Sequence, residues 1–342
     1  MNDIKGPVRV AAVQAASVFL NKDATVDKAC ALIREAGRNG ARLVALPETF
    51  IPGYPYWISI MDVSKGGAFN VRLFENSVPV PGPETAALGA AAREVGAYVV
   101  IGVNERGGRA LYNTLLFFGP DGRLLGKRRK LKGTFVEKAI WADGDASTHE
   151  VYDTAIGKLS GLICGEHTMA LPGYSLAQQG EEIHIAAWVG FCSALDPERR
   201  KRFRNMTESC ARYHATAFNA HVINTQSHVD EETLRVLGNP PPELLSVGGG
   251  WTAIIAGGTA EYLAGPLVDE EGILYADLDV AALTPYFFAR GTSPFFSVLV
   301  DQEEKAPLRR HAEAEAPRRE GDEAGAPGEN DRSRLGGKGA AA

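Results

Sequence analysis

The chain has 342 residues, of which 45% are hydrophobic, and acidic side chains outnumber basic ones by 42 to 36. A chain of this length and hydrophobicity can bury a sizeable core, and the expected organisation is one large α/β unit followed by a tail. The acidic balance and the lack of a basic stripe exclude a nucleic-acid-binding or anionic-membrane surface, so we expect a small organic molecule as the partner.

The four cysteines are far apart in the sequence and lack the spacing of zinc sites and disulfide frameworks. We therefore expect no metal site, no disulfide and a reduced, cytoplasmic environment. The polar residues 1–7 lead directly into an apolar run, and no stretch approaches the roughly 20 apolar residues of a membrane span, so neither a signal peptide nor a membrane segment is expected. The cysteines are Cys30, Cys164, Cys192 and Cys210.

The first half of the chain alternates apolar strands with amphipathic helices. The run VRVAAVQ, residues 8–14, is typical of a buried strand, and apolar residues then recur at helical spacing until Gly40. ARLVALPE supplies a second strand that ends at Glu48, and an Ala-rich helix over 84–95 leads into the strand AYVVIGV. In residues 110–131 two strand-like runs flank the turn GPDG, which predicts a hairpin and hence a mixed sheet.

The second half continues the same alternation. Strands are predicted at 158–164, at IHIAAW and at HVINTQ, and a long helix is predicted from about Pro197 to Asn219. The runs WTAIIA and ILYADLD look like a final hairpin. Residues 302–342 are rich in Glu, Arg, Ala, Gly and Pro, and such a segment buries too little apolar surface to offset its ordering entropy. We expect a domain over 1–301 and a disordered tail over 302–342.

Three side chains could carry chemistry. Cys164 ends the apolar run KLSGLIC before a predicted helix, a position that presents a nucleophile at a sheet edge, although free cysteines are more often small buried hydrophobes. Glu48 emerges from a strand into the aromatic loop IPGYPYW, where burial would raise its pKa and suit a general base; a turn cap is the alternative. Lys130 lies in the basic run KRRKLK, and such runs usually form a solvated face.

Other polar and aromatic residues surround these three. Glu137 follows Lys130, and Glu166 and His167 follow Cys164, where each could orient the nucleophile or the base or could lie on the surface. His184, within IHIAAW, is more typical of a core histidine than of a catalyst. The aromatic residues that could line a pocket or pack in the core are Tyr54, Tyr56, Trp57, Trp188 and Phe191.

These motifs resemble the nitrilase family of the carbon–nitrogen hydrolase superfamily from about residue 8 to about residue 301. LVALPETFIPGYPYW is similar to the family's glutamate motif, GKRRKLKGTFVEKAIWADGD to its lysine motif and GLICGEHTMAL to its cysteine motif. The resemblance implies a four-layer α-β-β-α sandwich with two mixed sheets. It also implies that Glu48 is the base, Lys130 the electrostatic stabiliser, Cys164 the nucleophile and Glu137 a supporting glutamate.

The function implied by the resemblance is hydrolysis of an organic nitrile to a carboxylic acid and ammonia, through a thioimidate and a thioester, without metal or cofactor. A nitrile carbon is a weak electrophile and needs a thiolate, a base and a cation beside its nitrogen. Tyr54, Trp57, Trp188 and His167 are expected to bind the substrate and to favour an aromatic or arylaliphatic nitrile. Family members assemble as homo-oligomers, often spirals, and the same is expected here.

The chain departs from the family pattern at Gly165, where many members have Trp, at His167, where Asn is frequent, and at Gly133, where Pro is common. These changes bear on substrate identity more than on reaction type. An amidase or a cyanide-hydrating enzyme would use the same three groups. From another class, an inactive oligomeric scaffold is the alternative, and the presence of all three catalytic residue types argues against it.

Overall fold

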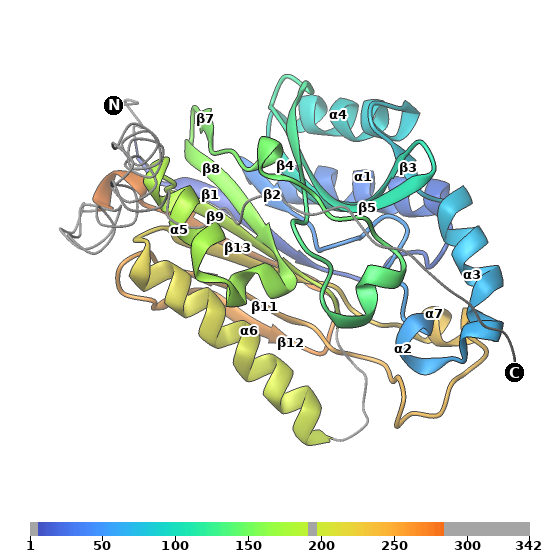
Figure 1. Ribbon diagram of the computed structural model, residues 1–342. Helices are drawn as coiled ribbons and strands as arrows, with labels where there is room; N and C mark the ends of the chain where they lie inside the picture. Colours follow the sequence, from blue (N-terminus) through green and yellow to red (C-terminus); the bar gives the residue numbers. More distant parts are fainter. Residues whose placement is uncertain (1–5, 191–196, 284–342) are drawn as a thin grey trace, which may run out of the picture. The chain divides into compact units, whose positions relative to one another are not determined.

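The strands of the protein form two sheets in the computed structural model, which describes residues 6–190 and 197–283 (Figure 1). The tail predicted at 302–342, the domain boundary at 301 and the residues Phe191 and Cys192 lie outside the described residues. Among the described residues, no helix is long and apolar enough to cross a membrane.

The first sheet combines parallel and antiparallel pairs. β1, β2 and β4 run parallel, whereas β13 is antiparallel to β1 and β5 is antiparallel to β4 and β6. The hairpin predicted over 110–131 is confirmed as β5 and β6. The strand order is β13 (Gly272–Leu278), β1 (Val8–Gln14), β2 (Leu43–Ala45), β4 (Tyr98–Gly107), β5 (Ala110–Phe118) and β6 (Leu124–Arg129), with β3 (Val78–Pro79) beside β4.

The second sheet is also mixed, with β8, β9 and β10 parallel and antiparallel strands at both sides. The predicted final hairpin is wrong. β11 pairs with β12 in this sheet, whereas β13 pairs with β1 in the first sheet. β12 was not predicted because Gly265 and Pro266 interrupt its strand pattern. The order is β12 (Tyr262–Val268), β11 (Trp251–Ile255), β10 (His221–Gln226), β9 (Ile183–Trp188), β8 (Gly157–Ile163) and β7 (Tyr152–Thr154).

β1 shows why the central strands read as continuous apolar runs. Successive side chains of a strand point to opposite faces. Val10 and Ala12 pack in the core between the two sheets, whereas Ala11 and Val13 pack in the core on the other face of the first sheet. Both faces are buried, so neither set of positions tolerates polar residues.

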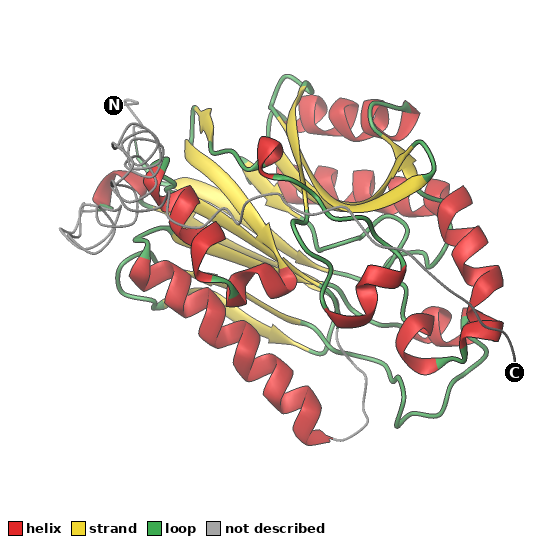
Figure 2. Cartoon of the chain, in the orientation of Figure 1, coloured by secondary structure: helices red, strands yellow, loops and turns green. Residues whose placement is uncertain are grey.

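Helices cover the outer face of each sheet (Figures 1 and 2). α1 (Lys22–Arg38) and α4 (Pro83–Val95) bury Ile33 and Leu88 against the first sheet. α6 (Pro197–Ala217) buries Ala211 and Ala215 against the second sheet, beside α5 (Ala170–Gln178). The order helix, sheet, sheet, helix confirms the expected four-layer sandwich.

Several short elements were not predicted. Three of them are α-helical, namely α2 (Trp57–Ile60), α3 (Val63–Glu75) and α7 (Glu231–Val236). The helix expected after Cys164 is a five-residue 3₁₀ turn, η3 (Cys164–Thr168), which α5 follows. Three further 3₁₀ turns are η1 (Phe135–Ala139), η2 (Ala146–Thr148) and η4 (Val280–Ala282).

Candidate active site

Glu48, Lys130 and Cys164 come from both sheets and meet in one buried cluster. Glu48 lies three residues after β2, and Lys130 and Cys164 directly follow β6 and β8. The Nζ of Lys130 lies 3.0 Å from Glu48 Oε1 and 2.7 Å from Glu137 Oε2. The Sγ of Cys164 and carboxylate oxygens of Glu48 and Glu137 lie within 4.8 Å of one another. The side chains from the three sequence motifs are therefore in contact range.

β4 holds the loop that carries Glu48. The N–H of Gly102 donates to the carbonyl of Pro47 at 3.0 Å, and the N–H of Ile51 donates to the carbonyl of Gly102 at 3.2 Å. A Cβ at Gly102 would lie 2.6 Å from the Cα of Glu48, so only glycine permits this approach. The backbone of β4 thereby fixes where the carboxylate leaves the chain.

The carboxylate of Glu48 has one occupied and one free oxygen. Oε1 accepts hydrogen bonds from Lys130 Nζ and from Asn113 Nδ2 at 2.6 Å, whereas Oε2 is buried with no hydrogen-bond partner among the described residues. Burial raises the pKa of Glu48 to about 7, against the opposing effects of Lys130 and Asn113. A carboxylate with a free oxygen and a pKa near neutrality is suited to accept a proton.

Lys130 supplies a fixed positive charge at the centre of the cluster. Burial lowers its pKa, but Glu48, the thiolate form of Cys164 and Glu137 more than reverse this effect, so the pKa lies above its usual value. The ammonium group binds both carboxylates of the cluster that Glu48 and Glu137 form with Cys164. A buried cation in this position can stabilise negative charge that develops on a reacting atom.

Glu137 holds Lys130 in place from the turn η1. Its carboxylate accepts hydrogen bonds from the Lys130 ammonium at 2.7 Å, from the backbone N–H of Thr134 at 2.7 Å and from the hydroxyl of Tyr54 at 3.2 Å. All three donors point to one buried carboxylate, and this leaves the Lys130 side chain little freedom to move. Tyr54, predicted to bind substrate, thus contacts the supporting glutamate.

Cys164 lies at a sharp turn between β8 and η3, with φ of +49°. Left-handed conformations are unfavourable for residues other than glycine, and they cluster at functional sites. Burial raises the pKa of the Cys164 thiol, and Glu48 raises it further, whereas Lys130 and a hydrogen bond with the Gly165 backbone lower it. The resting group is therefore a thiol that needs a base before it can attack.

A buried ion pair stabilises the turn at Cys164. Glu166 accepts two hydrogen bonds from Arg128, at 2.5 and 3.0 Å, and both side chains are almost completely buried. Glu166 also accepts the backbone N–H groups of Ile163 and Leu131, each at 2.8 Å. One carboxylate therefore ties the residue before Cys164 to the residue after Lys130.

Arg128 was not singled out within its basic run, although strand alternation could have identified it. Side chains two residues apart share a face of a strand. Lys127 and Arg129 both pair with Glu105 on one side of β6, and Arg128 points to the other side. A solvated face was the alternative interpretation of this run, but Arg128 and Lys130 are both buried.

A cavity of about 450 Å³ opens beside Cys164. Both glycines that depart from the family pattern, Gly133 and Gly165, lie in its wall. A Cβ at Gly165 would lie 2.5 Å from the Oγ1 of Thr134, so a larger residue requires Thr134 to move. Apolar side chains in the wall are Phe135, Met169, Phe203 and Met206.

The remaining residues predicted to bind substrate do not line this cavity. The ring of Trp57 stacks on Phe69, and its Nε1 donates to Asn70 at 2.8 Å. Trp188 is fully buried and stacks on His167, whose Nδ1 lies 2.8 Å from the carbonyl oxygen of Cys164. Trp188 and His167 thus lie beside the nucleophile turn, and a role in substrate binding stays a prediction for all four residues.

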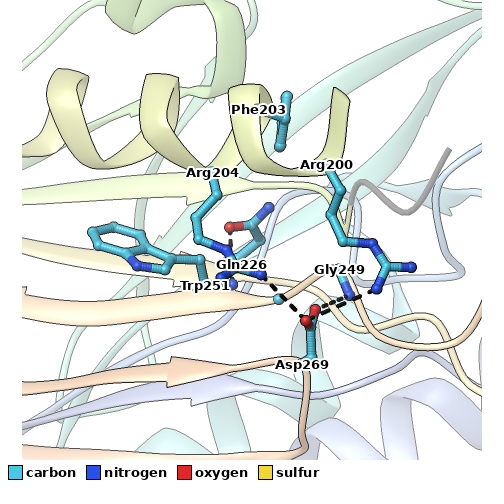
Figure 3. Close-up of a pocket in the computed structure, with 8 residues that line it drawn as sticks. Arg200, Phe203, Arg204, Gln226, Gly249, Trp251 and Asp269 are labelled. Atoms are coloured by element: carbon cyan, nitrogen blue, oxygen red, sulfur yellow. Dashed lines mark hydrogen bonds and ion pairs between the residues drawn. The ribbon is translucent and has the colours of Figure 1, made fainter. Parts of the chain in front are cut away.

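A second pocket lies between α6 and the second sheet (Figure 3). Asp269 accepts the backbone N–H of Gly249 at 2.7 Å and a hydrogen bond from Arg204 at 3.3 Å, and Arg200 lies 3.9 Å away. The pocket volume is about 10 Å³, which is little more than the space of one water molecule. These residues therefore form a cluster of ion pairs and not a ligand site.

Comparison with known proteins identifies the family. The family model for carbon–nitrogen hydrolase matches residues 9–286. A nitrilase of Bacillus sp. (strain OxB-1) is 37% identical over 90% of this chain and 91% of its own, and an aliphatic nitrilase of Rhodococcus rhodochrous is 40% identical over 81% and 76%. A carbon–nitrogen hydrolase of Helicobacter pylori G27 has the same fold, with a TM-score of 0.69, 23% identity and coverage of 88% and 98%. The chain belongs to the nitrilase family of carbon–nitrogen hydrolases.

Proposed function

We propose that the protein hydrolyses an organic nitrile to a carboxylic acid and ammonia, with Cys164 as nucleophile, Glu48 as base and Lys130 as stabilising cation. The observation that carries this proposal is the free Oε2 of Glu48 in a cluster that holds both the thiol and a buried ammonium group. The names of the nitrilases from Bacillus and Rhodococcus support a nitrile as the substrate.

The first half of the reaction forms a bond between Cys164 and the nitrile carbon. Glu48 Oε2 takes the thiol proton as the sulfur attacks, and one π bond of the nitrile breaks. Negative charge develops on the nitrile nitrogen, where the ammonium group of Lys130 stabilises it, and Glu48 passes the proton taken from the thiol to this nitrogen, which returns Glu48 to its carboxylate form. The product of this half-reaction is a thioimidate.

The second half releases the products. Water, activated by Glu48, adds to the thioimidate carbon, and ammonia leaves with a proton to give a thioester. A second water molecule, again deprotonated by Glu48, attacks the thioester carbon. The C–S bond then breaks, the acid departs and Cys164 regains its proton. Lys130 stabilises the oxyanion in this half, and Glu137 keeps Lys130 in position.

The cavity favours a nitrile with an aromatic or arylaliphatic group. Its volume of about 450 Å³ falls within the range of small-molecule sites. The apolar side chains Phe135, Met169, Phe203 and Met206 supply a wall that a phenyl ring can contact, and Gly165 leaves the space beside the sulfur open.

The test is ammonia release from aliphatic, aromatic and arylacetic nitriles and from their matched amides, with the products identified by chromatography. Acid and ammonia from nitriles, lost in Cys164→Ala and kept in the control Cys210→Ala, are expected. Turnover of amides alone would move the protein to the amidase branch, and formamide or formate from cyanide would identify a cyanide-hydrating enzyme. Inactivity on all substrates would revive the scaffold alternative.

We further propose a cytoplasmic homo-oligomer. Leu171 on α5 and Tyr213 on α6 are 66% and 55% exposed, which is unusual for large apolar groups and suits an interface between copies. The free cysteines Cys30, Cys164 and Cys210 suit a reducing compartment. Light scattering after size-exclusion chromatography should show an oligomer that the Leu171→Lys substitution weakens, and a monomeric wild type would refute the assembly. Cell fractionation tests the compartment.

A further inference from the structure

A chain of hydrogen bonds lies beside the Cys164 turn and takes no part in the mechanism above. Nδ1 of His167 lies 2.8 Å from the carbonyl oxygen of Cys164, and its Nε2 lies 3.0 Å from Nε2 of His184. Nδ1 of His184 lies 2.6 Å from Glu181 Oε1, and Nε2 of His214 lies 2.7 Å from Glu181 Oε2. All of these side chains are buried.

The hydrogen bonds of His167 and His184 require more ring protons than two neutral histidines carry. The carbonyl of Cys164 can only accept a hydrogen bond, so His167 Nδ1 must be protonated. The carboxylate of Glu181 also accepts, so His184 Nδ1 must be protonated, and the contact between the two Nε2 atoms needs one more proton. Three of the four ring nitrogens then carry a proton, whereas two neutral imidazoles supply only two.

Two other histidines, the partly buried His149 and the buried His221, show the usual pattern. His149 accepts a hydrogen bond from Arg128 on Nδ1 and faces the carbonyl of Pro172 with Nε2. His221 accepts from the N–H of Gly257 on Nδ1 and faces the carbonyl of Asp279 with Nε2. In each ring one nitrogen accepts and the other donates, so a single neutral tautomer satisfies both contacts.

The carboxylate of Glu181 balances the positive charge that the additional proton gives to the pair of His167 and His184. Burial lowers the pKa of His167 and lowers that of His184 to about 4, although Glu181 acts in the opposite direction on His184; the third proton is required by the hydrogen-bond contacts and not by these pKa shifts. Buried charges are tolerated when they are paired, and Glu181 is a carboxylate whose pKa is held below its usual value by His184 and His214 despite burial. Ser160 also donates a hydrogen bond to Glu181. The cation and the carboxylate together carry no net charge.

The other titratable groups that face this chain are already paired. Arg128 opposes protonation of His167 and His184, but its guanidinium is bound to Glu166. His214 stacks on His184 with ring centroids 3.5 Å apart, and its Nε2 lies against Glu181 Oε2, so the proton of that contact is on Nε2 of His214. The thiol of Cys164 is uncharged at rest because burial raises its pKa.

Glu181, His184 and His214 have the residue types of a metal site but not its spacing. Ligand atoms around a tetrahedral zinc with bonds of about 2.0 Å are about 3.3 Å apart. The contacts here are 2.6 and 2.7 Å, which are hydrogen-bond lengths, and the two rings stack on each other.

We propose that His167, His184 and Glu181 form a protonated relay that positions the Cys164–Gly165 peptide, with His167 as the positioning residue. In a trans peptide the carbonyl and the following N–H point in opposite directions. By fixing the carbonyl of Cys164, His167 orients the N–H of Gly165, whose hydrogen bond with the thiol lowers the pKa of Cys164. The relay also holds Cys164 in its left-handed conformation.

The proton count is tested without substrate, so its outcome does not depend on the proposed function. Nitrogen-15 NMR of histidine-labelled protein at neutral pH reports which ring nitrogens are protonated, and spectra of His167→Asn and His184→Gln assign the signals. We expect three protonated nitrogens in the pair of His167 and His184, and one each in His149 and His221. Two protonated nitrogens in the pair, or zinc bound to wild-type protein but not to His184→Gln, would overturn the relay.

The positioning role rests on the proposed function and is tested on the best nitrile of the panel. His167→Leu removes the donor to the Cys164 carbonyl, and misplacement of reacting groups costs up to about 100-fold in rate. We expect kcat to fall about 10-fold to 100-fold with KM changed less than about twofold, and His167→Asn, whose amide can donate, to recover part of the loss. The control His221→Gln should retain wild-type kcat.

Two kinetic outcomes would refute this role. A rise in KM at unchanged kcat would make His167 a substrate-binding residue, and equal losses in His167→Leu and His167→Asn would show that the hydrogen bond to the carbonyl is unimportant. If no nitrile, amide or cyanide is turned over, the proposed function fails, while the NMR proton count still decides whether the relay exists.

Discussion

Asn113 controls the protonation of the candidate base. Its Nδ2 donates to Glu48 Oε1 at 2.6 Å, and this hydrogen bond lowers a pKa that burial raises to about 7. A hydrogen bond to a charged group contributes about 1.5–3 kcal/mol, and one pKa unit corresponds to about 1.4 kcal/mol. Asn113→Leu should therefore raise the pKa of Glu48 by about 1–2 units. The backbone N–H of Lys130 also donates to the backbone carbonyl of Asn113, and this hydrogen bond does not involve the substituted side chain.

The assay is the pH dependence of kcat/KM for ammonia release. Glu48 must be ionised to accept the thiol proton, so kcat/KM falls as the pH drops through its pKa, and the acid limb of the variant should move to higher pH. Asn224→Leu is the matched control, because Asn224 is buried and donates to the backbone of Trp251 instead. An acid limb that stays in place or moves to lower pH would refute the role of Glu48 or its coupling to Asn113.

Three further predictions concern the residues that support the site. Arg128→Met should destabilise the protein by about 3–5 kcal/mol in urea unfolding, because it leaves Glu166 as an unpaired buried carboxylate. Arg128→Met/Glu166→Gln should recover part of this lost stability, and an equal loss of stability in the single and the double variant would contradict the coupling of the two residues. Gly165→Ala should lower kcat/KM because its Cβ meets Thr134 Oγ1 at 2.5 Å, and Thr134→Ala should relieve the loss. The pKa of Glu166 is lowered in the fold, chiefly by Arg128 against the effect of burial, so its stabilisation is present above its unfolded pKa of about 4.3 and is lost as the pH falls through the folded value. The free energy of unfolding should therefore depend less on pH, below the unfolded pKa of about 4.3, in the Glu166→Gln variant than in the wild type.

Local patterns predicted the elements of the fold better than their partners. The run at β1 and the apolar spacing of α1 show burial directly, because alternation and helical periodicity are properties of neighbouring residues. β11 and β13 were both recognised as strands, yet they pair in different sheets. Strand partners depend on contacts between distant segments, which no short window of sequence contains. The half-exposed β12, with a glycine and a proline, carried too weak a pattern to be found.

The candidate site shows the same division. The motif resemblance singled out Glu48, Lys130 and Cys164, and these side chains do lie together. Glu137 and Glu166 were named as candidates, whereas Asn113 and Arg128 were not found, because Asn113 is one polar residue in a strand and Arg128 is one charge in a basic run. Their importance comes from the carboxylates that they meet across the fold, which are distant in the sequence.

The three side chains to which we assign the proposed reaction are divided between the two sheets, so the core between the sheets sets their separation. Glu48 and Lys130 extend from the first sheet and Cys164 from the second, and side chains such as Leu115 and Ile185 act as spacers between them. Protein interiors are close-packed, so even a change of one methylene in this layer perturbs the packing between the sheets. We therefore expect the rate of the proposed reaction to depend on core residues between the sheets that never touch the substrate.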